Sequence, residues 1–260
     1  MGTSQVQGQL WGEAPDDWAE LNEPTGVPLF EAAFDAMGVG SGARLLDVGC
    51  GAGLALVLAA KRGATVSGLD ASDGLLEVAR GRLPGADLRQ GDVEELPYAD
   101  TSFDAVTAFN SVQYAADTGR ALGEIKRVAA AGAPVAVASW GDPERCEARF
   151  LLGALGGLLP PPPPGAGGPF ALAAPGALEA LLESAQLTVD RALEVPTPFV
   201  YADLAAAVRG GLASGPARAA IRHAGPDRTR DAATGALEQF VQPDGTVRLD
   251  NVMRVAIARA

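Results

Sequence analysis

A glycine-rich loop at residues 49–53 (GCGAG) is the part of this sequence best suited to bind a ligand. It follows a short apolar stretch, LLDV, and precedes a helical pattern. Glycines at such a turn let backbone amides approach a ligand at the N-terminus of the helix, which suits the pyrophosphate of a dinucleotide. The glycines follow one another as G-x-G-x-G, however, and not as the G-x-G-x-x-G of nicotinamide enzymes. The loop alone therefore predicts a ligand site and leaves the ligand open.

Asp47, just before the first glycine, favours a ligand that carries positive charge. A carboxylate at this place would face the two phosphate charges of a dinucleotide, whereas it would attract an ammonium or a sulfonium group. S-adenosylmethionine (SAM) carries both of these groups. The residue type and its position therefore favour SAM over a nicotinamide cofactor.

Two more acids, Asp70 and Asp92, follow the next two apolar stretches. Asp70 lies at roughly the 20-residue spacing expected of a carboxylate that accepts hydrogen bonds from ribose hydroxyls. Asp92, next to a backbone amide, can pair with the N6 donor and the N1 acceptor of adenine. Each acid alone would equally suit a strand-end cap or a turn. Because the carboxyl ends of parallel strands meet at one edge of a sheet, the three acids together predict a single line of ligand-binding residues.

The elements that would position these acids alternate between strand and helix from residue 43 to about residue 140, which is typical of a parallel sheet built from βαβ units. The expected strands are 44–48, 65–69, 87–90, 103–109 and 134–139, and the expected helices are 52–62, 73–83 and 117–130. We therefore expect an α/β fold, a Rossmann-like, doubly wound, mostly parallel seven-stranded sheet.

After residue 140 the pattern changes. Helices are expected over 145–158 and from Pro175 onward, and a strand over 187–195. Alanine-rich helices over 201–240 would form a helical lid insertion. Residues 247–258 alternate between apolar and polar, which predicts an antiparallel closing strand near an edge of the sheet. The run Pro160–Pro164, with its following glycines, fits either a solvated connector or the mobile rim of a substrate pocket.

The expected organisation has three parts: an N-terminal helical cap segment (1–42), a SAM-binding α/β core (43–140), and substrate-covering helices with the last two strands of the same domain (141–260). The chain has 260 residues with 20 basic and 32 acidic side chains, a net charge of -12 that disfavours nucleic acid and anionic membranes as partners. We expect a small-molecule substrate, and the composition leaves the oligomeric state open.

The two cysteines and the single histidine offer no cluster of metal ligands, so no metal is expected, although a carboxylate-only Mg²⁺ site stays open. Cys50, inside the glycine loop, argues against a disulfide scaffold. The first ten residues lack a basic flank and an apolar core, and no apolar run approaches the roughly 20 residues that span a bilayer. A soluble, cytoplasmic protein is the expectation.

Several motifs together resemble those of class I SAM-dependent methyltransferases, in particular the methyltransferase type 11 branch related to ubiquinone and menaquinone biosynthesis. The resemblance covers about residues 11–140 through the segments LDVGCGAG (46–53), GLDAS (68–72), GDVEELP (91–97), SFDAV (102–106) and ALGEIKRV (121–128). It implies the cofactor SAM and methyl transfer to a small molecule.

The same resemblance assigns roles to residues of the strand ends. Asp47, Gly49 and Gly51 would line the methionine end of SAM, Asp70 with the adjacent Ala71 would hold the ribose, Asp92 and Val93 the adenine, and Asn110 the methionine moiety. Gln113 stands where many relatives have histidine, so no catalytic role carries over to that position.

The sequence gives weaker signals for substrate-binding residues than for cofactor-binding residues. Trp18, Tyr114, Trp140 and Tyr201 are candidates for substrate binding, with plain packing as the alternative for each; Trp11 and Trp18 could also close over the cofactor. His223, the only histidine, is the candidate catalytic residue. It would act as a general base if the acceptor were a hydroxyl, and the alternative is a surface residue at a helix end.

Methyl transfer is an in-line displacement that depends mainly on alignment and on the exclusion of water. The Pro-, Gly- and Ala-rich segments after residue 140 favour a neutral, hydrophobic acceptor, such as a secondary metabolite or a quinone-like ring. Two alternatives remain open: a SAM-binding enzyme of the same fold that catalyses a cyclisation, a decarboxylation or a similar non-methylating step, and a binding module without enzymatic activity.

Overall fold

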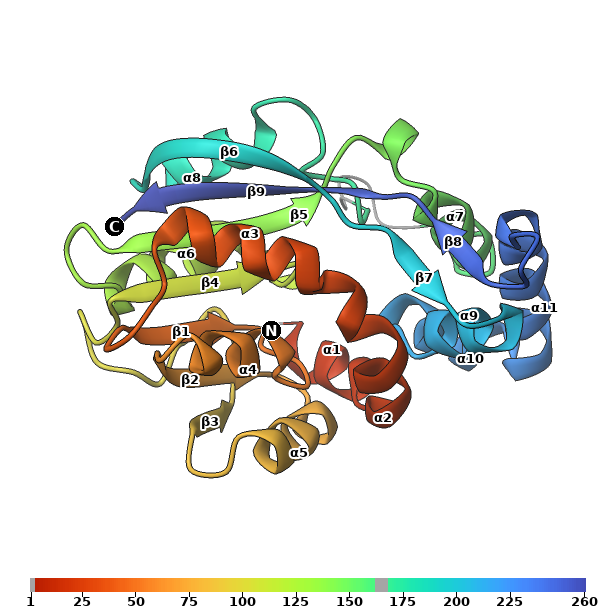
Figure 1. The fold of residues 1–260 in the computed structure, drawn as a ribbon, viewed down its shortest axis with the longest axis horizontal. Coiled ribbons are helices and arrows are strands. Elements are labelled where there is room, and N and C mark those ends of the chain that lie inside the picture. The colour runs from red at the N-terminus through yellow and green to blue at the C-terminus, as the bar shows by residue number, and fades with distance from the viewer. Residues whose placement is uncertain (1–2, 162–167) are drawn as a thin grey trace.

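The computed structural model describes residues 3–161 and 168–260. Its main sheet has seven strands in the order β3-β2-β1-β4-β5-β9-β6, of which β1 to β5 are parallel and β9 runs antiparallel to both of its neighbours (Figure 1). The strands are β1 (Arg44–Val48), β2 (Thr65–Asp70), β3 (Asp87–Gln90), β4 (Ala105–Phe109), β5 (Pro134–Trp140), β6 (Thr188–Pro196) and β9 (Val252–Arg259). The predicted fold class is confirmed.

The order of the strands reverses at β1, which pairs with β2 on one side and β4 on the other. In open α/β sheets, ligands bind in the crevice outside the carboxyl ends of the strands at such a point. The topology therefore places the predicted site at the ends of β1 and β4, where Asp47 and Asn110 lie.

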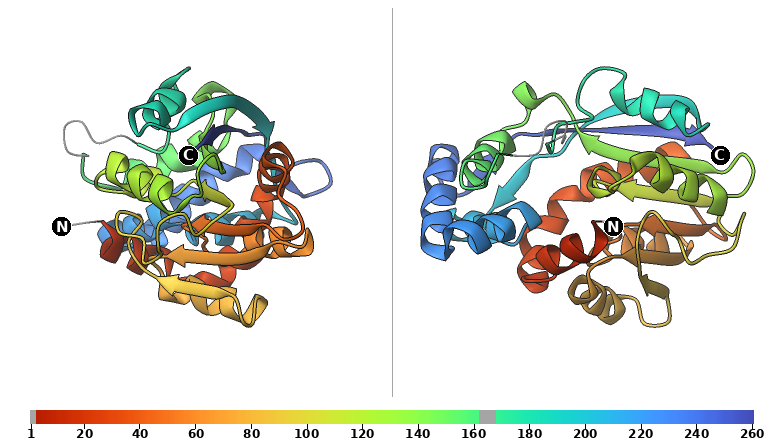
Figure 2. Two further views of the ribbon diagram at one scale, coloured as in Figure 1. Left: turned by 90° about the vertical axis from the view of Figure 1, so that its left-hand side faces the viewer. Right: turned by 180° about the vertical axis from the view of Figure 1, so that it is seen from behind.

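Helices cover both faces of the main sheet (Figure 2). One face packs against α3 (Val27–Met37), α4 (Leu54–Lys61) and α5 (Asp73–Arg82), and the other against α6 (Thr118–Val128) and α8 (Ala177–Ser184). Leu46 and Val48 face one of these cores and Leu45 faces the other, because successive residues of a strand point to opposite faces. The apolar stretch before the glycine loop is thus buried on both sides, as in other parallel sheets.

A second lobe lies beyond the carboxyl ends of the parallel strands (Figure 1). It contains α7 (Ala148–Gly156), α9 (Leu204–Leu212), α10 (Gly215–Ala224), α11 (Pro226–Leu237) and the antiparallel ribbon of β7 (Phe199–Tyr201) and β8 (Val247–Leu249). The lobe has an apolar core of its own, in which residues of β7, α9, α11 and β8 pack together. We call these elements the insertion lobe.

The predicted closing strand 247–258 is wrong in one respect, since it is two strands with different partners. β8 pairs with β7 in the insertion lobe, and β9 pairs with β5 and β6 in the main sheet. Between them Asn251 is buried, and its Oδ1 accepts a hydrogen bond of 2.9 Å from the amide of Ala148. The alternation of side chains continues through the break and so cannot reveal it. β9 is antiparallel and near an edge as predicted, next to the edge strand β6.

The N-terminal segment lies between the main sheet and the insertion lobe (Figure 1). It consists of α1 (Ser4–Trp11), α2 (Pro15–Asp17), a π-helical turn (Trp18–Asn22) and a 3-10 turn (Glu23–Gly26) that leads into α3. Gly8 of α1 rests on the loop after β2, where a Cβ atom would lie only 2.2 Å from the carbonyl oxygen of Ala71. This close approach brings the segment onto the edge at which the predicted ligand site lies.

Most of the proline run lies outside the described residues, which include Pro160 and Pro161 but not 162–167, so both of its interpretations stay predictions. Over the described part of the chain, no helix combines the length and the apolar character needed to cross a bilayer.

Candidate active site

A cavity of about 280 Å³ lies at the carboxyl ends of the parallel strands, between the main sheet, the N-terminal segment and the insertion lobe. It brings together all of the residues that the sequence predicted for the cofactor and the substrate. These are Asp47, Gly49, Gly51, Asp70, Ala71, Asp92, Val93 and Asn110 for the cofactor, and Trp18, Tyr114, Trp140 and Tyr201 for the substrate. His223 is not among the residues that line it.

The glycine loop adopts a conformation that side chains would strain. Gly49, Gly51 and Gly53 have φ angles of 81°, 54° and 84°, in the left-handed region. The amide of Gly49 donates a 2.7 Å hydrogen bond to the carbonyl oxygen of Leu69. A Cβ atom on Gly49 would lie 2.3 Å from the Cβ of Ser111, so the end of β1 and the loop after β4 meet here with no room for a side chain.

Asp47 is buried, with 2% of its surface exposed, and its Oδ1 accepts a 2.7 Å hydrogen bond from the hydroxyl of Thr107. Burial, with a smaller contribution from the carboxylates of Asp70 and Glu23, raises the pKa of Asp47 from 3.8 to about 7, against the hydrogen bond from Thr107. An ionised Asp47 is thus costly in the free protein. A cation placed in the cavity would recover that cost.

Asp70 joins two loops of the site. Its Oδ2 accepts a hydrogen bond from the amide of Gly51 and its Oδ1 accepts one from the amide of Ser72, both of 2.8 Å. Burial raises its pKa, while these amides lower it. Each carboxylate oxygen can accept more than one hydrogen bond, so Asp70 can still bind hydroxyls of a ligand in the cavity.

Asp92 and Asn110 sit in tight turns at the cavity wall. Asp92 accepts a 3.0 Å hydrogen bond from the amide of Glu94, which orients its carboxylate. Asn110 has a φ of 51°, a left-handed conformation that asparagine tolerates better than most residues. Its amide donates to the carbonyl oxygen of Ala138 at 3.0 Å, so the loop after β4 is fixed to β5. Gln113 is absent from the cavity wall and donates a weak 3.4 Å hydrogen bond to Asn110.

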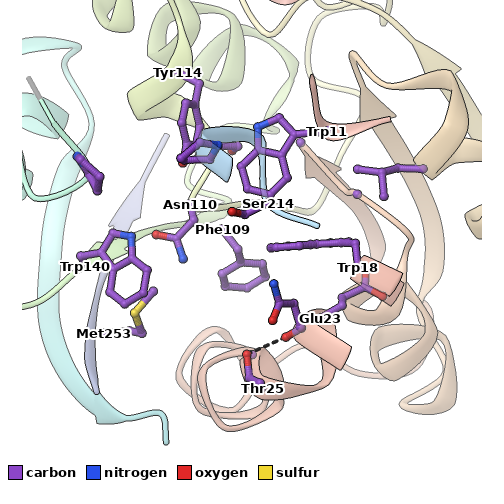
Figure 3. A pocket seen from close by; sticks show the side chains of 18 of the residues that line it. Trp11, Trp18, Glu23, Thr25, Phe109, Asn110, Tyr114, Trp140, Ser214 and Met253 are labelled. Carbon is purple, nitrogen blue, oxygen red and sulfur yellow. Dashed lines mark hydrogen bonds between the residues drawn. The ribbon is translucent and has the colours of Figure 1, made fainter. Parts of the chain in front are cut away.

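Away from the acids the cavity is aromatic (Figure 3). Trp140, at the end of β5, lies beside Met253 and packs at ring-centroid distances of 5.5 Å from Phe170 and 5.9 Å from Phe199. On the other side of Asn110, Trp18 lies near Glu23 and forms an edge-to-face pair with Trp11 at 4.7 Å. The cavity therefore has an acidic end at the glycine loop and an aromatic end under the insertion lobe.

The prediction that His223 acts in catalysis is not supported by its position. His223 lies in the last turn of α10 and is exposed, on a face of the helix that does not reach the cavity. A general base must come within hydrogen-bond distance of the proton that it takes, directly or through one water. The placement agrees with the alternative, a surface residue at a helix end.

Sequence reasoning missed Glu23 and Asn22, which line the cavity from the N-terminal segment. Glu23 is 7% exposed, and burial raises its pKa. It belongs to no recognisable motif, so the sequence carried no signal for it. Phe30, Phe109 and Met253 were missed for a different reason, because only the fold brings these apolar residues together.

Comparison with known proteins agrees with this geometry. Residues 46–137 match the model of a family described as a methyltransferase domain. The chain is 38% identical over 145 residues to the methyltransferase GfsG of Streptomyces halstedii (53% of this chain, 51% of that protein). It is 39% identical over 109 residues to the demethylmenaquinone methyltransferase of Renibacterium salmoninarum (42% and 46%).

These matches agree with the resemblance that the motifs predicted over this part of the chain. The chain spans about half the length of the curated relatives that it matches. Two solved structures share the fold. The cyclase SpnF has a TM-score of 0.63 at 20% identity (98% of this chain, 96% of that chain). A SAM-dependent methyltransferase of Aquifex aeolicus has a TM-score of 0.54 at 21% identity (70% and 92%).

The cofactor that the methyltransferase domain implies is SAM, as predicted. The acidic end of the cavity fits it. Asp47 is buried with a hydroxyl as its hydrogen-bond partner, Asp70 keeps free acceptor capacity, and the glycine loop leaves room for close approach of a ligand. SAM, through its ammonium and its sulfonium group, supplies the positive charge that this set of carboxylates favours.

Proposed function

We propose that the protein transfers a methyl group from SAM to an uncharged, apolar small molecule with a planar, unsaturated group. The bound cofactor would supply the electrophilic methyl carbon. In this proposal Asp47 and Asn110 hold the methionine end of the cofactor next to the Gly49–Gly51 backbone, Asp70 with Ala71 holds the ribose, and Asp92 with Val93 holds the adenine. The aromatic end of the cavity then receives the acceptor.

The observation that supports the proposal most is the change from charged to aromatic side chains along the cavity. The charged side chains that line it in the described structure are Glu23, Asp47, Asp70 and Asp92, all at the acidic end. The other end would leave the charge of an ionic acceptor unpaired, which is costly in an apolar site. This supports an uncharged acceptor.

Aromatic residues support a planar acceptor. Only 5% of the residues in this chain are aromatic, yet Phe30, Trp140, Phe199 and Tyr201 all line the end of the cavity away from the acids. Aromatic rings pack well against other flat, unsaturated groups. The demethylmenaquinone methyltransferase among the relatives bears the name of an acceptor with such a ring.

Alignment and exclusion of water would carry most of the catalysis. Burial raises the pKa of Tyr114 to about 12 and also raises that of Tyr201, so neither phenol is a ready base at neutral pH. The carboxylates of the cavity lie at the cofactor end. An acceptor that is nucleophilic while uncharged, and that releases its hydroxyl proton to water after methyl transfer, would therefore suit this site better than one that needs a protein base.

A second candidate is a SAM-binding enzyme that catalyses a cyclisation or another non-methylating step. The likeness to the cyclase SpnF extends over 98% of this chain, so the fold alone does not separate the two functions. An apolar cavity that aligns a flexible, unsaturated substrate would serve either reaction.

Calorimetry with SAM and with NAD, followed by assays on paired acceptors, tests the proposal. We expect heat of binding with SAM and none with NAD. Naphthols should gain one methyl group with equimolar S-adenosylhomocysteine, and in calorimetry they should bind more tightly than the saturated decahydronaphthols. Trp140→Leu should weaken naphthol binding by about two- to tenfold and leave SAM affinity unchanged. Turnover of an unsaturated substrate without a methyl group or S-adenosylhomocysteine would favour the second candidate instead.

A further inference from the structure

We propose that Asn22 and Glu23 are positioning residues that connect the cofactor loop to the wall of the acceptor cavity. The two residues follow one another where the π-helical turn passes into the 3-10 turn, and both line the cavity. Glu23 holds the glycine loop and Asn22 holds the insertion lobe. This inference rests on the proposed function for the role of the acceptor cavity, but its tests measure binding and exchange alone.

Glu23 holds the glycine loop from two sides. Its Oε1 accepts a 3.0 Å hydrogen bond from the amide of Leu54, the first residue of α4, and its Oε2 pairs with the guanidinium of Arg82. The same guanidinium donates a 2.9 Å hydrogen bond to the carbonyl oxygen of Ala52, within the loop. Glu23 lies outside the matched methyltransferase domain, so the loop of this domain is fixed by a residue that the domain does not contain.

Asn22 holds the insertion lobe through both atoms of its amide. Its Nδ2 donates a 2.7 Å hydrogen bond to the carbonyl oxygen of Gly210 in α9, and its Oδ1 accepts one of 2.7 Å from the hydroxyl of Tyr201 in β7. Tyr201 is 7% exposed, and a Cβ atom on Gly210 would lie 3.0 Å from the Oδ1 of Asn22. The contact is close and largely shielded from water, which strengthens its hydrogen bonds.

A short physical connection therefore runs from the glycine loop through Glu23 and Asn22 to β7 and α9, both of which line the acceptor end. A ligand that orders the glycine loop also restrains Glu23, and the adjacent backbone restrains Asn22. We expect cofactor binding to reduce the motion of β7 and α9, so that the wall of the acceptor cavity is more rigid when the cofactor is bound.

Hydrogen exchange of the full chain, with and without S-adenosylhomocysteine, tests the Asn22 half of the connection. In the wild type the ligand should slow exchange both at 49–54 and at 199–212, the latter by about fivefold or more. In Tyr201→Phe and in Asn22→Ala the protection at 49–54 should remain, and that at 199–212 should fall below about twofold. Equal protection of 199–212 in the variants and the wild type would overturn the inference.

Arg209→Gln is the matched control for this measurement. Arg209 of α9 pairs with Asp17 and Glu20 of the N-terminal segment, so it joins the same two parts of the molecule, but its side chain is 53% exposed. Exposed ion pairs contribute little. We expect wild-type protection in this variant, and a loss equal to that in Tyr201→Phe would mean that any contact between the two parts suffices.

Calorimetry on Glu23→Gln, with SAM and with S-adenosylhomocysteine, tests the other half. A positioning role through the loop predicts an equal loss of affinity for both ligands, of about tenfold or more. Direct attraction of the sulfonium charge predicts a larger loss for SAM and would overturn the inference. Arg82→Gln should cause the same loss, and the double variant should be no worse than either single one. A wild type that bound neither ligand would overturn both the proposed function and this inference, whereas ligand binding with unequal losses in Glu23→Gln would overturn the inference alone.

Discussion

The two ends of the cavity differ in how the chain builds them. Apart from Glu23 of the N-terminal segment, the acids of the acidic end lie at the ends of β1, β2 and β3, each one or two residues from a loop glycine or a helix cap. The aromatic end draws Phe30, Trp140, Phe199 and Met253 from four separate parts of the chain. Local geometry thus makes most of the acidic end, and only the tertiary fold makes the aromatic end.

This difference has an energetic side. In the free protein, ionisation of the carboxyl groups at the acidic end is unfavourable, because burial raises the pKa values of Asp47, Asp70 and Glu23. The aromatic end, by contrast, is stable as it stands, since its rings pack against one another. Substitutions at the acidic end should therefore change affinity most, and substitutions outside the cavity should change it least.

Asp70→Ala should produce the largest effect. It removes the hydrogen bonds from the amides of Gly51 and Ser72 and the proposed acceptor for the ribose hydroxyls. Charge-assisted bonds of this kind contribute about 1.5–3 kcal/mol each. We expect SAM affinity to fall about a hundredfold by calorimetry while the fold is retained. Asp73→Ala is the control, because Asp73 pairs with Arg80 on the surface and does not line the cavity. Unchanged affinity in folded Asp70→Ala would make Asp70 a purely structural cap.

A change of pH should alter the affinity for SAM by an amount between the largest and the smallest of these effects. The pKa of Asp47 is raised to about 7, so below that pH the free protein holds it protonated and binding of a cation must release the proton. Affinity should rise about tenfold per pH unit up to about pH 7 and then level off. Asp47→Asn should bind weakly and lose this dependence.

The stability of the free protein should change with pH in the opposite direction. Asp47 binds a proton more tightly in the folded than in the unfolded chain, so its contribution to the free energy of unfolding falls as pH rises from about 4 to about 7. Urea unfolding of the wild type and of Asp47→Asn checks this, and the variant should be the more stable of the two at pH 8. If the difference in the free energy of unfolding between the wild type and Asp47→Asn were the same at pH 4 and at pH 8, the raised pKa of Asp47 would be contradicted.

Much of the acidic end could be predicted from the sequence, because strand periodicity and turn residues are local signals. Asp47, Asp70, Asp92 and Asn110 all line the cavity as expected. Glu23 could not be predicted, since its role depends on contacts with Leu54 and Arg82, far along the chain.

The break between β8 and β9 could not be predicted from the sequence for a related reason. Two strands that alternate in the same way differ only in their partners, and partners are a property of the fold. The surroundings of His223 are also a property of the fold. Its residue type suggested a general base, but it lies on a face of α10 that is exposed.

His223→Gln should produce the smallest effect. The side chain is exposed at the end of α10 and does not line the cavity, so it cannot take a proton from an acceptor bound beside Trp140. General-base catalysis is worth roughly 10²–10⁴-fold, so a true base would be unmistakable in a rate measurement. We expect product formation in the naphthol assay to stay within about twofold of the wild type, with the two pH profiles parallel between about pH 6 and 8. A hundredfold loss with unchanged SAM affinity would require α10 to turn this face toward the cavity during turnover, and the acceptor end would then be a moving site instead of a preformed one.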